Sequence, residues 1–219
     1  MRKTIVLIVA AALCAAPALA DTLANWTFEV SIPATAGPHA AELGLNAASS
    51  FASGFHASTS TVYSNPVGNG SNESFSSNFW ATGDYYQFTT STLGYESITF
   101  GWDQTRSSTG PDIFDLQYSL DGTTFTTLLD NFTVLANASP NPVWNSTTYY
   151  AMYTFAPVAV PADAANQPIV YFRLTSQVTP TNTAGTNRVD NVIIDGTLIP
   201  EPATLTLLAL GALGLIRRR

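Results

Sequence analysis

Apolar and polar residues alternate with a period of two along much of the chain, which is typical of β-strands with one buried face. In DIFDLQYSLDG, which begins at residue 112, Phe114, Leu116, Tyr118 and Leu120 share one face, while Asp115, Gln117 and Ser119 share the other. The same pattern predicts strands in NWTFEVSI, DYYQFTT, YESITFGWD, TYYAMYTFA, PIVYFRLTS and RVDNVIIDG, which begin at residues 25, 84, 95, 148, 168 and 188. Trp26 and Trp102 alternate with apolar neighbours there and are predicted to lie in the core.

Turn residues separate these strands. Asp121-Gly122 predicts a tight hairpin, with a partner strand that starts at Thr123, because Gly tolerates positive φ and Asp bonds its own backbone. Residues 38–49 predict at most a turn of helix, and residues 49–77 are expected to form long surface loops with a strand or two. The sequence therefore predicts an all-β fold, an antiparallel two-sheet β-sandwich that is jelly-roll-like.

The N-terminus has the three parts of a secretory signal peptide. Arg2 and Lys3 are followed by the apolar run 4–16, and Ala18-Leu19-Ala20 supplies small residues for cleavage before Asp21. The single cysteine of the chain lies within the apolar run, so the predicted mature chain has none. We expect a signal peptide at 1–20 and one exported domain at 21–199, stabilised by its core rather than by disulfides.

Charge is sparse in the predicted domain. Residues 21–199 contain three arginines, no lysine and fourteen acidic residues. Such a surface repels phosphate backbones, so nucleic-acid binding is not expected. Asn-x-Ser/Thr triplets are frequent, but a chain rich in these residues produces many by chance.

Residues for catalysis are scarce. The sequence lacks a Gly-x-Ser-x-Gly elbow, a His-Glu-x-x-His motif and a phosphate-binding glycine loop. His39 and His56 are expected to be solvated loop histidines rather than a metal site, and a Ser-His-Asp triad stays open because triads assemble in space. We therefore expect no catalytic residue and no enzyme activity.

Acidic pairs near strand ends are the other candidates. Asp112 with Asp115, and Asp190 with Asp195, could hold a sugar between two carboxylates, but such acids more often cap turns. Because the spaced acids of a calcium-binding loop are missing, we expect no cofactor and no metal site, with a structural calcium ion as the alternative.

Two tryptophans lie beside turn residues. Trp80, in NFWATGDYYQF, and Trp144, in NPVWNSTTYY, are the candidates for an exposed glycan contact, because aromatic rings stack on sugar rings. For both, burial under a loop is the commoner outcome and the one we expect more often.

The C-terminus has three successive elements. Pro200-Glu201-Pro202 precedes an apolar run at 203–216, and Arg217-Arg218-Arg219 ends the chain. As a helix the run would extend about 21 Å against a hydrocarbon core of about 30 Å. The pattern predicts a short transmembrane helix that holds its arginines on the cytoplasmic side while the domain lies outside.

This tripartite end, residues 200–219, resembles the PEP-CTERM sorting signal of Gram-negative bacteria. The resemblance implies recognition at Pro-Glu-Pro by exosortase, a membrane-embedded transpeptidase, after signal peptidase has acted. The body, through GNGSNESFSSNFWATGDYYQF and RVDNVIIDG, also looks like the sandwich domain common in that group.

These features together predict an exported, exosortase-processed protein of the cell surface or extracellular matrix, transiently anchored in the membrane and associated with exopolysaccharide or biofilm. A carbohydrate-binding module is the alternative, and a hydrolase acting on polysaccharide is the second alternative.

Overall fold

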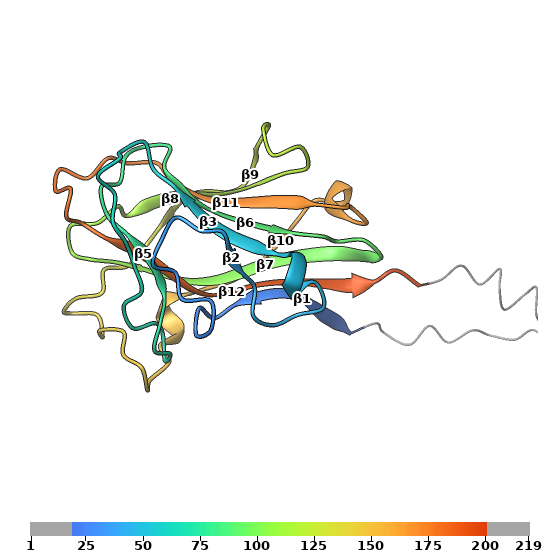
Figure 1. Cartoon of the computed structure of the whole chain (residues 1–219), viewed down its shortest axis with the longest axis horizontal. Helices are drawn as coiled ribbons and strands as arrows, with labels where there is room; N and C mark the ends of the chain where they lie inside the picture. The colour runs from blue at the N-terminus through green and yellow to red at the C-terminus, as the bar shows by residue number, and fades with distance from the viewer. Residues whose placement is uncertain (1–18, 201–219) are drawn as a thin grey trace, which may run out of the picture.

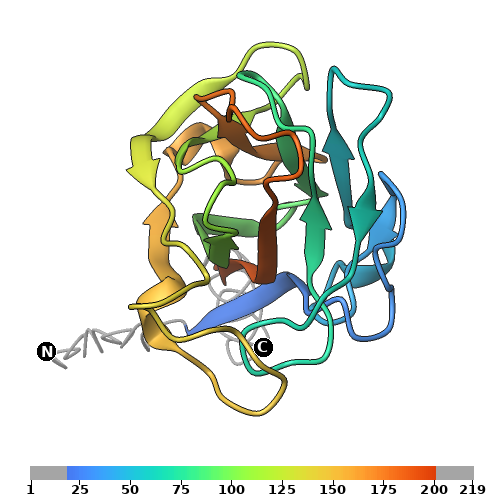
Figure 2. The ribbon, with the colours of Figure 1, turned by 90° about the vertical axis from the view of Figure 1, so that its left-hand side faces the viewer.

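The computed structural model describes residues 19–200, which form two antiparallel sheets packed face to face (Figures 1 and 2). The first sheet has the order β10-β7-β12-β5-β4, with β1 also paired to β12. Its strands are β1 (Ala20–Trp26), β4 (Tyr63–Ser64), β5 (Phe75–Ser77), β7 (Tyr95–Arg106), β10 (Thr154–Ala159) and β12 (Asn187–Leu198). The second sheet has the order β2-β3-β6-β11-β8-β9. Its strands are β2 (His39–Ala40), β3 (Phe51–Phe55), β6 (Tyr85–Thr90), β8 (Ile113–Ser119), β9 (Thr126–Thr133) and β11 (Val170–Ser176).

From β5 to β8 and from β10 to β12, successive strands alternate between the sheets. β5 and β7 belong to the first sheet, whereas β6 and β8 belong to the second, and the later run β10, β11, β12 alternates in the same way. This crossing between layers is the jelly-roll pattern. The predicted all-β, antiparallel two-sheet sandwich is confirmed.

The inward faces of both sheets form one aromatic core. In β6 and β11 every even-numbered residue from Tyr86 to Phe88 and from Val170 to Leu174 is buried, as the period-two pattern predicts. The rings of Phe100 and Phe172, from opposite sheets, stack with centroids 5.1 Å apart. Trp26 and Trp102, at 0% and 1% exposure, lie in this core as predicted.

Several boundaries differ from the sequence-based prediction. The first strand lies earlier than expected and ends at Trp26, because Phe28 adopts a positive φ of 58° and turns the chain. Within residues 38–49, the expected turn of helix is limited to a 3-10 helix at Ala47–Ser49, and His39–Ala40 form β2. Gly44, at φ 106°, brings the backbone so close to β1 that a Cβ would lie 2.6 Å from the Leu23 carbonyl oxygen.

Two further 3-10 helices, Ala151–Tyr153 and Ala162–Ala164, flank β10. The alternating pattern predicts that all of the segment 148–156 is a strand, but Ala151–Tyr153 within it form the first of these 3-10 helices. The remaining strand, β10, starts only at Thr154.

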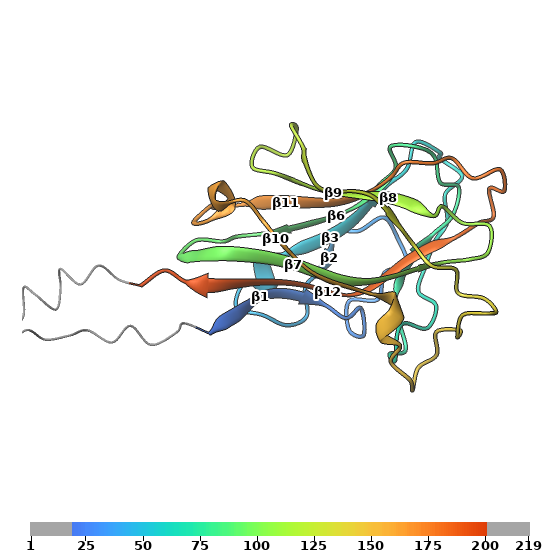
Figure 3. The same ribbon diagram turned by 180° about the vertical axis from the view of Figure 1, so that it is seen from behind.

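The two ends of the described chain lie at the same end of the sandwich (Figures 1 and 3). Ala20 at the start of β1 pairs with Thr197 near the end of β12. Within residues 19–200, no helix has the length and apolar character needed to cross a membrane. The predicted transmembrane helix at 203–216 lies outside the described residues.

Candidate functional site

The outward face of the second sheet carries an ordered array of aromatic and polar side chains. Strand register aligns Phe51, Thr89 and Tyr171 in one row across β3, β6 and β11. The next row contains Ser53, Gln87, Arg173 and Gln117, and the row beyond it begins with Phe55 and Tyr85. We call this surface, made by the residues just named, the aromatic face.

Side chains of the aromatic face are accessible. Phe51 and Phe55 are 40% and 50% exposed, and Tyr85, Gln87, Tyr171 and Arg173 are half-buried. The Phe55 and Tyr85 rings stack with centroids 5.1 Å apart. A polar row thus runs between two rows that carry aromatic rings. Each aromatic row lies about 7 Å from the polar row along the strands, so the two aromatic rows are about 13 Å apart.

The loop between β8 and β9, residues 120–125, borders the aromatic face and rises above the sheet (Figure 1). A Cβ on Gly122 would lie 3.1 Å from the Tyr171 ring, so this loop packs against that ring. β8 and β9 pair as the predicted hairpin, and Gly122 in the loop between them has a φ of 72°. Its loop is longer than the predicted tight turn, since β9 begins at Thr126 rather than Thr123.

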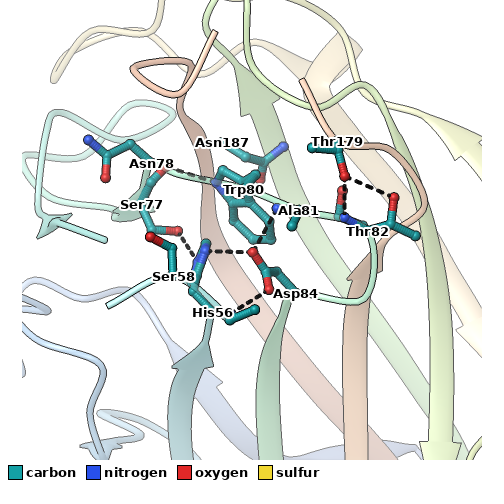
Figure 4. Close-up of polar contacts among 12 residues, drawn as sticks. His56, Ser58, Ser77, Asn78, Trp80, Ala81, Thr82, Asp84, Thr179 and Asn187 are labelled. Carbon is teal, nitrogen blue, oxygen red and sulfur yellow. Dashed lines mark hydrogen bonds and ion pairs between the residues drawn. The ribbon is translucent and has the colours of Figure 1, made fainter. Parts of the chain in front are cut away.

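A second polar cluster lies between β3 and β5, at the end of the sandwich away from the termini (Figure 4). His56 Nδ1 is 3.1 Å from Asp84 Oδ2, and His56 Nε2 is 3.0 Å from Ser77 Oγ. His56 thus joins Asp84 to Ser77, in the same order of contacts as the Asp, His and Ser of a hydrolase triad. The sequence left such a set open, and the structure brings these three side chains together.

Burial argues against catalysis by this cluster. Ser77 is 0% exposed, and its hydroxyl also bonds the Tyr86 hydroxyl at 3.0 Å. The Trp80 ring packs on His56 with centroids 4.4 Å apart, and burial lowers the pKa of His56 although the Asp84 carboxylate opposes this. Because a nucleophile has to reach the substrate, we interpret the cluster as a packed structural network.

Asp84 explains that structural role. Its carboxylate accepts hydrogen bonds from the backbone N–H groups of Ala57 at 2.8 Å and Ala81 at 2.7 Å. Two loops are therefore tied to the start of β6 through one buried side chain.

A third cluster joins two buried carboxylates from the first sheet, Asp103 and Asp190, which are 1% and 0% exposed. Asn69 donates its backbone N–H to Asp190 at 2.8 Å and its side-chain amide to Asp103 at 3.0 Å. Asn191 also donates to both, at 3.4 Å to Asp190 and 2.8 Å to Asp103. Burial raises the pKa of Asp190 to about 7, against the hydrogen bonds that favour its charged form.

The buried carboxylates are surrounded by donors rather than by further ligands. Ser71 and Thr154 donate hydroxyl groups to Asp190 and Asp103. Among residues 19–200, no three His, Cys, Asp or Glu side chains gather as metal ligands do. A structural calcium ion stays a prediction.

The members of each predicted carboxylate pair have different partners in the structure. Asp115 accepts a bond from the backbone N–H of Asn131 at 2.8 Å, while Asp112 lies 3.9 Å from Arg106. Asp190 shares its donors with Asp103, not with Asp195. Asp103 and Asp190 lie side by side because they are cross-strand partners in β7 and β12.

Both tryptophans predicted as exposed glycan contacts are buried. Trp80 is 4% exposed and donates its indole N–H to the Ser77 carbonyl at 2.9 Å. Trp144 is 1% exposed and packs edge-on against Tyr153 with centroids 5.8 Å apart. The candidate glycan contact at these residues is therefore wrong, and the more frequent outcome, burial under a loop, is confirmed, because the turn-rich segments around the rings fold back over them.

The prediction of solvated histidines is also wrong. His39 is 7% exposed and packs edge-on against Phe75, and the His56 side chain is 1% exposed. Each ring therefore belongs to the packed interior.

Residues of the two predicted processing sites lie at the boundary of the described chain. Ala20, Asp21 and Pro200 are exposed at the shared end of the sandwich. Ala18, Glu201, Pro202 and Arg217 to Arg219 lie outside the described residues.

Solved structures resemble the sandwich at low sequence identity. The CBM22-1 xylan-binding domain of Paenibacillus barcinonensis Xyn10C superposes with a TM-score of 0.50 at 9% identity, over 84% of this chain and 100% of that chain. The K1 cleaved adhesin domain of Lys-gingipain from Porphyromonas gingivalis gives a TM-score of 0.45 at 17% identity, over 82% and 99%. The first likeness supports the fold alone, and the class it defines is a jelly-roll-like β-sandwich protein.

Sequence comparison identifies the C-terminal end. Residues 198–219 match the family model described as the PEP-CTERM protein-sorting motif. The C-terminal end of the chain therefore carries a PEP-CTERM protein-sorting motif, as the resemblance of the tail predicts. A search of curated proteins finds no match to the chain.

The sequence-based search missed the aromatic face. The signal was present in the polar phase of the strands, where Tyr85, Tyr171 and Arg173 occupy positions that alternate with core residues. Strand order was needed to place these side chains in neighbouring rows, and alternation in single strands does not give that order.

Proposed function

We propose that this chain is an exported, non-enzymatic protein of the cell surface or extracellular matrix that binds polysaccharide through the aromatic face. Signal peptidase would remove residues 1–20, and exosortase would recognise Pro200-Glu201-Pro202 while 203–216 anchor the chain transiently in the membrane. The matched sorting motif supports the delivery. Exopolysaccharide of the surrounding matrix is the proposed ligand.

The arrangement of the aromatic face is the observation that carries the binding proposal. Aromatic rings offer apolar surfaces to the C–H faces of sugars, and the polar row between them offers donors and acceptors to hydroxyl groups. From Phe51 to Phe55 the face extends about 13 Å along a strand, enough for a short segment of a glycan chain. The likeness to a xylan-binding domain agrees with this proposal.

Affinity electrophoresis tests the binding proposal. The mature protein would be run through gels that contain neutral or acidic polysaccharides, together with Tyr171→Ala. We expect at least one polysaccharide to retard the protein and Tyr171→Ala to weaken that binding about tenfold, which corresponds to about 1.4 kcal/mol.

Tyr149→Ala is the matched control, because Tyr149 is 54% exposed and lines a hollow at the first sheet together with Trp102 and Pro157, away from the aromatic face. The proposal fails if no polysaccharide retards the protein, or if Tyr149→Ala and Tyr171→Ala weaken binding equally.

A further inference from the structure

Arg173 has an unusual setting at the centre of the aromatic face. Its guanidinium carbon lies 3.8 Å from the ring centroid of Tyr85 and 3.7 Å from that of Phe125. Its Nε donates to the Gln87 Oε1 at 2.9 Å. The two rings and this bond fix the plane of the guanidinium group.

The two terminal nitrogens of Arg173 have no hydrogen-bond partner among residues 19–200, and no carboxylate there forms an ion pair with them. Arg106 differs, since it donates to the carbonyls of Val134, Ser107 and Ser108 and lies 3.9 Å from Asp112. Arg173 is therefore a fixed cation with unused donors, in a domain with few cations.

Acidic side chains near the aromatic face are already engaged. Asp115 accepts the bond from the Asn131 backbone N–H, and Asp121 accepts bonds from Thr123 and Thr124 in the loop. The acidic surface elsewhere is screened beyond about 8 Å at physiological ionic strength. Local contacts at Arg173 can therefore favour an anion despite the overall charge.

A guanidinium group with free terminal nitrogens matches the geometry of a carboxylate, because two parallel N–H···O bonds can form. A sugar hydroxyl would use a single donor and leave the charge unpaired. Arg stays protonated at all physiological pH values, although burial lowers the pKa of Arg173 somewhat.

We infer that the aromatic face selects a carboxylate-bearing polysaccharide, such as a polyuronate, and that Arg173 pairs with its carboxylate groups. This inference rests on the proposed polysaccharide binding and specifies its ligand class. Gln87 and Gln117, which lie in the same row as Arg173, then contact the sugar hydroxyls. The aromatic rings of the two flanking rows contact the sugar faces.

Matched polymers test the inference. Polygalacturonate and alginate are compared with their methyl-esterified forms, which keep the backbone and remove the charge. By affinity electrophoresis, we expect the wild-type protein to bind one of the acidic polymers at least about tenfold more tightly than its ester, and Arg173→Gln to abolish that difference.

Two further variants separate charge from geometry. Arg106→Gln makes the same change in net charge away from the aromatic face and should keep the preference. Arg173→Lys keeps the charge without the planar fork and should lose several-fold in affinity for the acidic polymer. Thermal unfolding of each variant shows whether the fold is retained.

The possible failures differ. The carboxylate inference is overturned if the wild-type protein binds each acidic polymer no more tightly than its ester, or if Arg173→Gln keeps the wild-type preference. In either case, Tyr171-dependent binding of a neutral polysaccharide would leave the proposed function standing. If neither neutral nor acidic polysaccharides bind, both are overturned.

Discussion

At the scale of single residues, Asp190 is a fully buried carboxylate whose ionisation the fold opposes. Its folded-state pKa of about 7 lies above the usual value of 3.8. The folded protein therefore binds this proton more tightly than the unfolded chain, and the contribution of Asp190 to stability falls as pH rises from about 4 to about 7.

Replacing Asp190 with Asn removes this titration. The variant loses one acceptor at every pH, but its stability relative to wild type should rise between pH 5 and pH 8, by at most about 3 kcal/mol at about 1.4 kcal/mol per pKa unit. Urea unfolding at the two pH values measures the difference. Parallel pH profiles for wild type and Asp190→Asn would contradict the assignment.

Trp144 is a buried residue whose side chain contributes to the packing of the protein. Trp144→Ala should destabilise the protein by about 3–5 kcal/mol through loss of packing against Tyr153. Folded Trp144→Ala protein should bind polysaccharide as wild type does, because the ring is 1% exposed. Urea unfolding and affinity electrophoresis check the two expectations, and a folded variant that has lost binding would refute the second.

At the scale of elements, the β8–β9 hairpin controls one border of the aromatic face. Backbone N–H groups of Thr124 and Thr123 hold the pKa of Asp121 well below its usual range, so the carboxylate is charged and fixes the loop. The same loop carries Phe125, which covers Arg173.

Asp121→Ala should therefore loosen the loop, displace Phe125 from Arg173 and weaken polysaccharide binding about threefold. Affinity electrophoresis measures the effect. Asp130→Ala is the control, since Asp130 is an exposed acid of β9 and its removal changes net charge equally. Equal effects of the two substitutions would show that charge, not loop geometry, is responsible.

At the scale of the whole molecule, both ends of the described chain lie at one end of the sandwich, which agrees with the proposed processing at one membrane surface. β12 pairs with β1, β5 and β7, and its last residue, Leu198, stands two positions before Pro200. The strand that completes the first sheet is thus adjacent in sequence to the sorting motif.

Intact-mass spectrometry tests the proposed processing. In cells with exosortase, the mature protein should begin at Asp21 and lack Arg217 to Arg219, whereas exosortase-deficient cells should retain the arginines. A tail that is intact in both cell types would contradict the proposal.

Much of the fold was predictable because local alternation reports burial. The strands around Phe114, Phe100 and Phe172 were predicted from period two alone, and the structure places all three rings at 0% exposure. Trp80 and Trp144 could not be placed in this way, because they lie in irregular segments without periodicity. Their burial depends on how distant loops fold over them.

The sequence by itself determined the all-β class and the sorting motif, since both depend on residues that are close together along the chain. Tertiary structure alone decided that Tyr171, Arg173 and Gln87 share one surface, and that His56, Ser77 and Asp84 meet in the interior. These groupings join residues from separate strands and loops, and the order of strands in a sheet is fixed by packing of the whole core rather than by any local pattern.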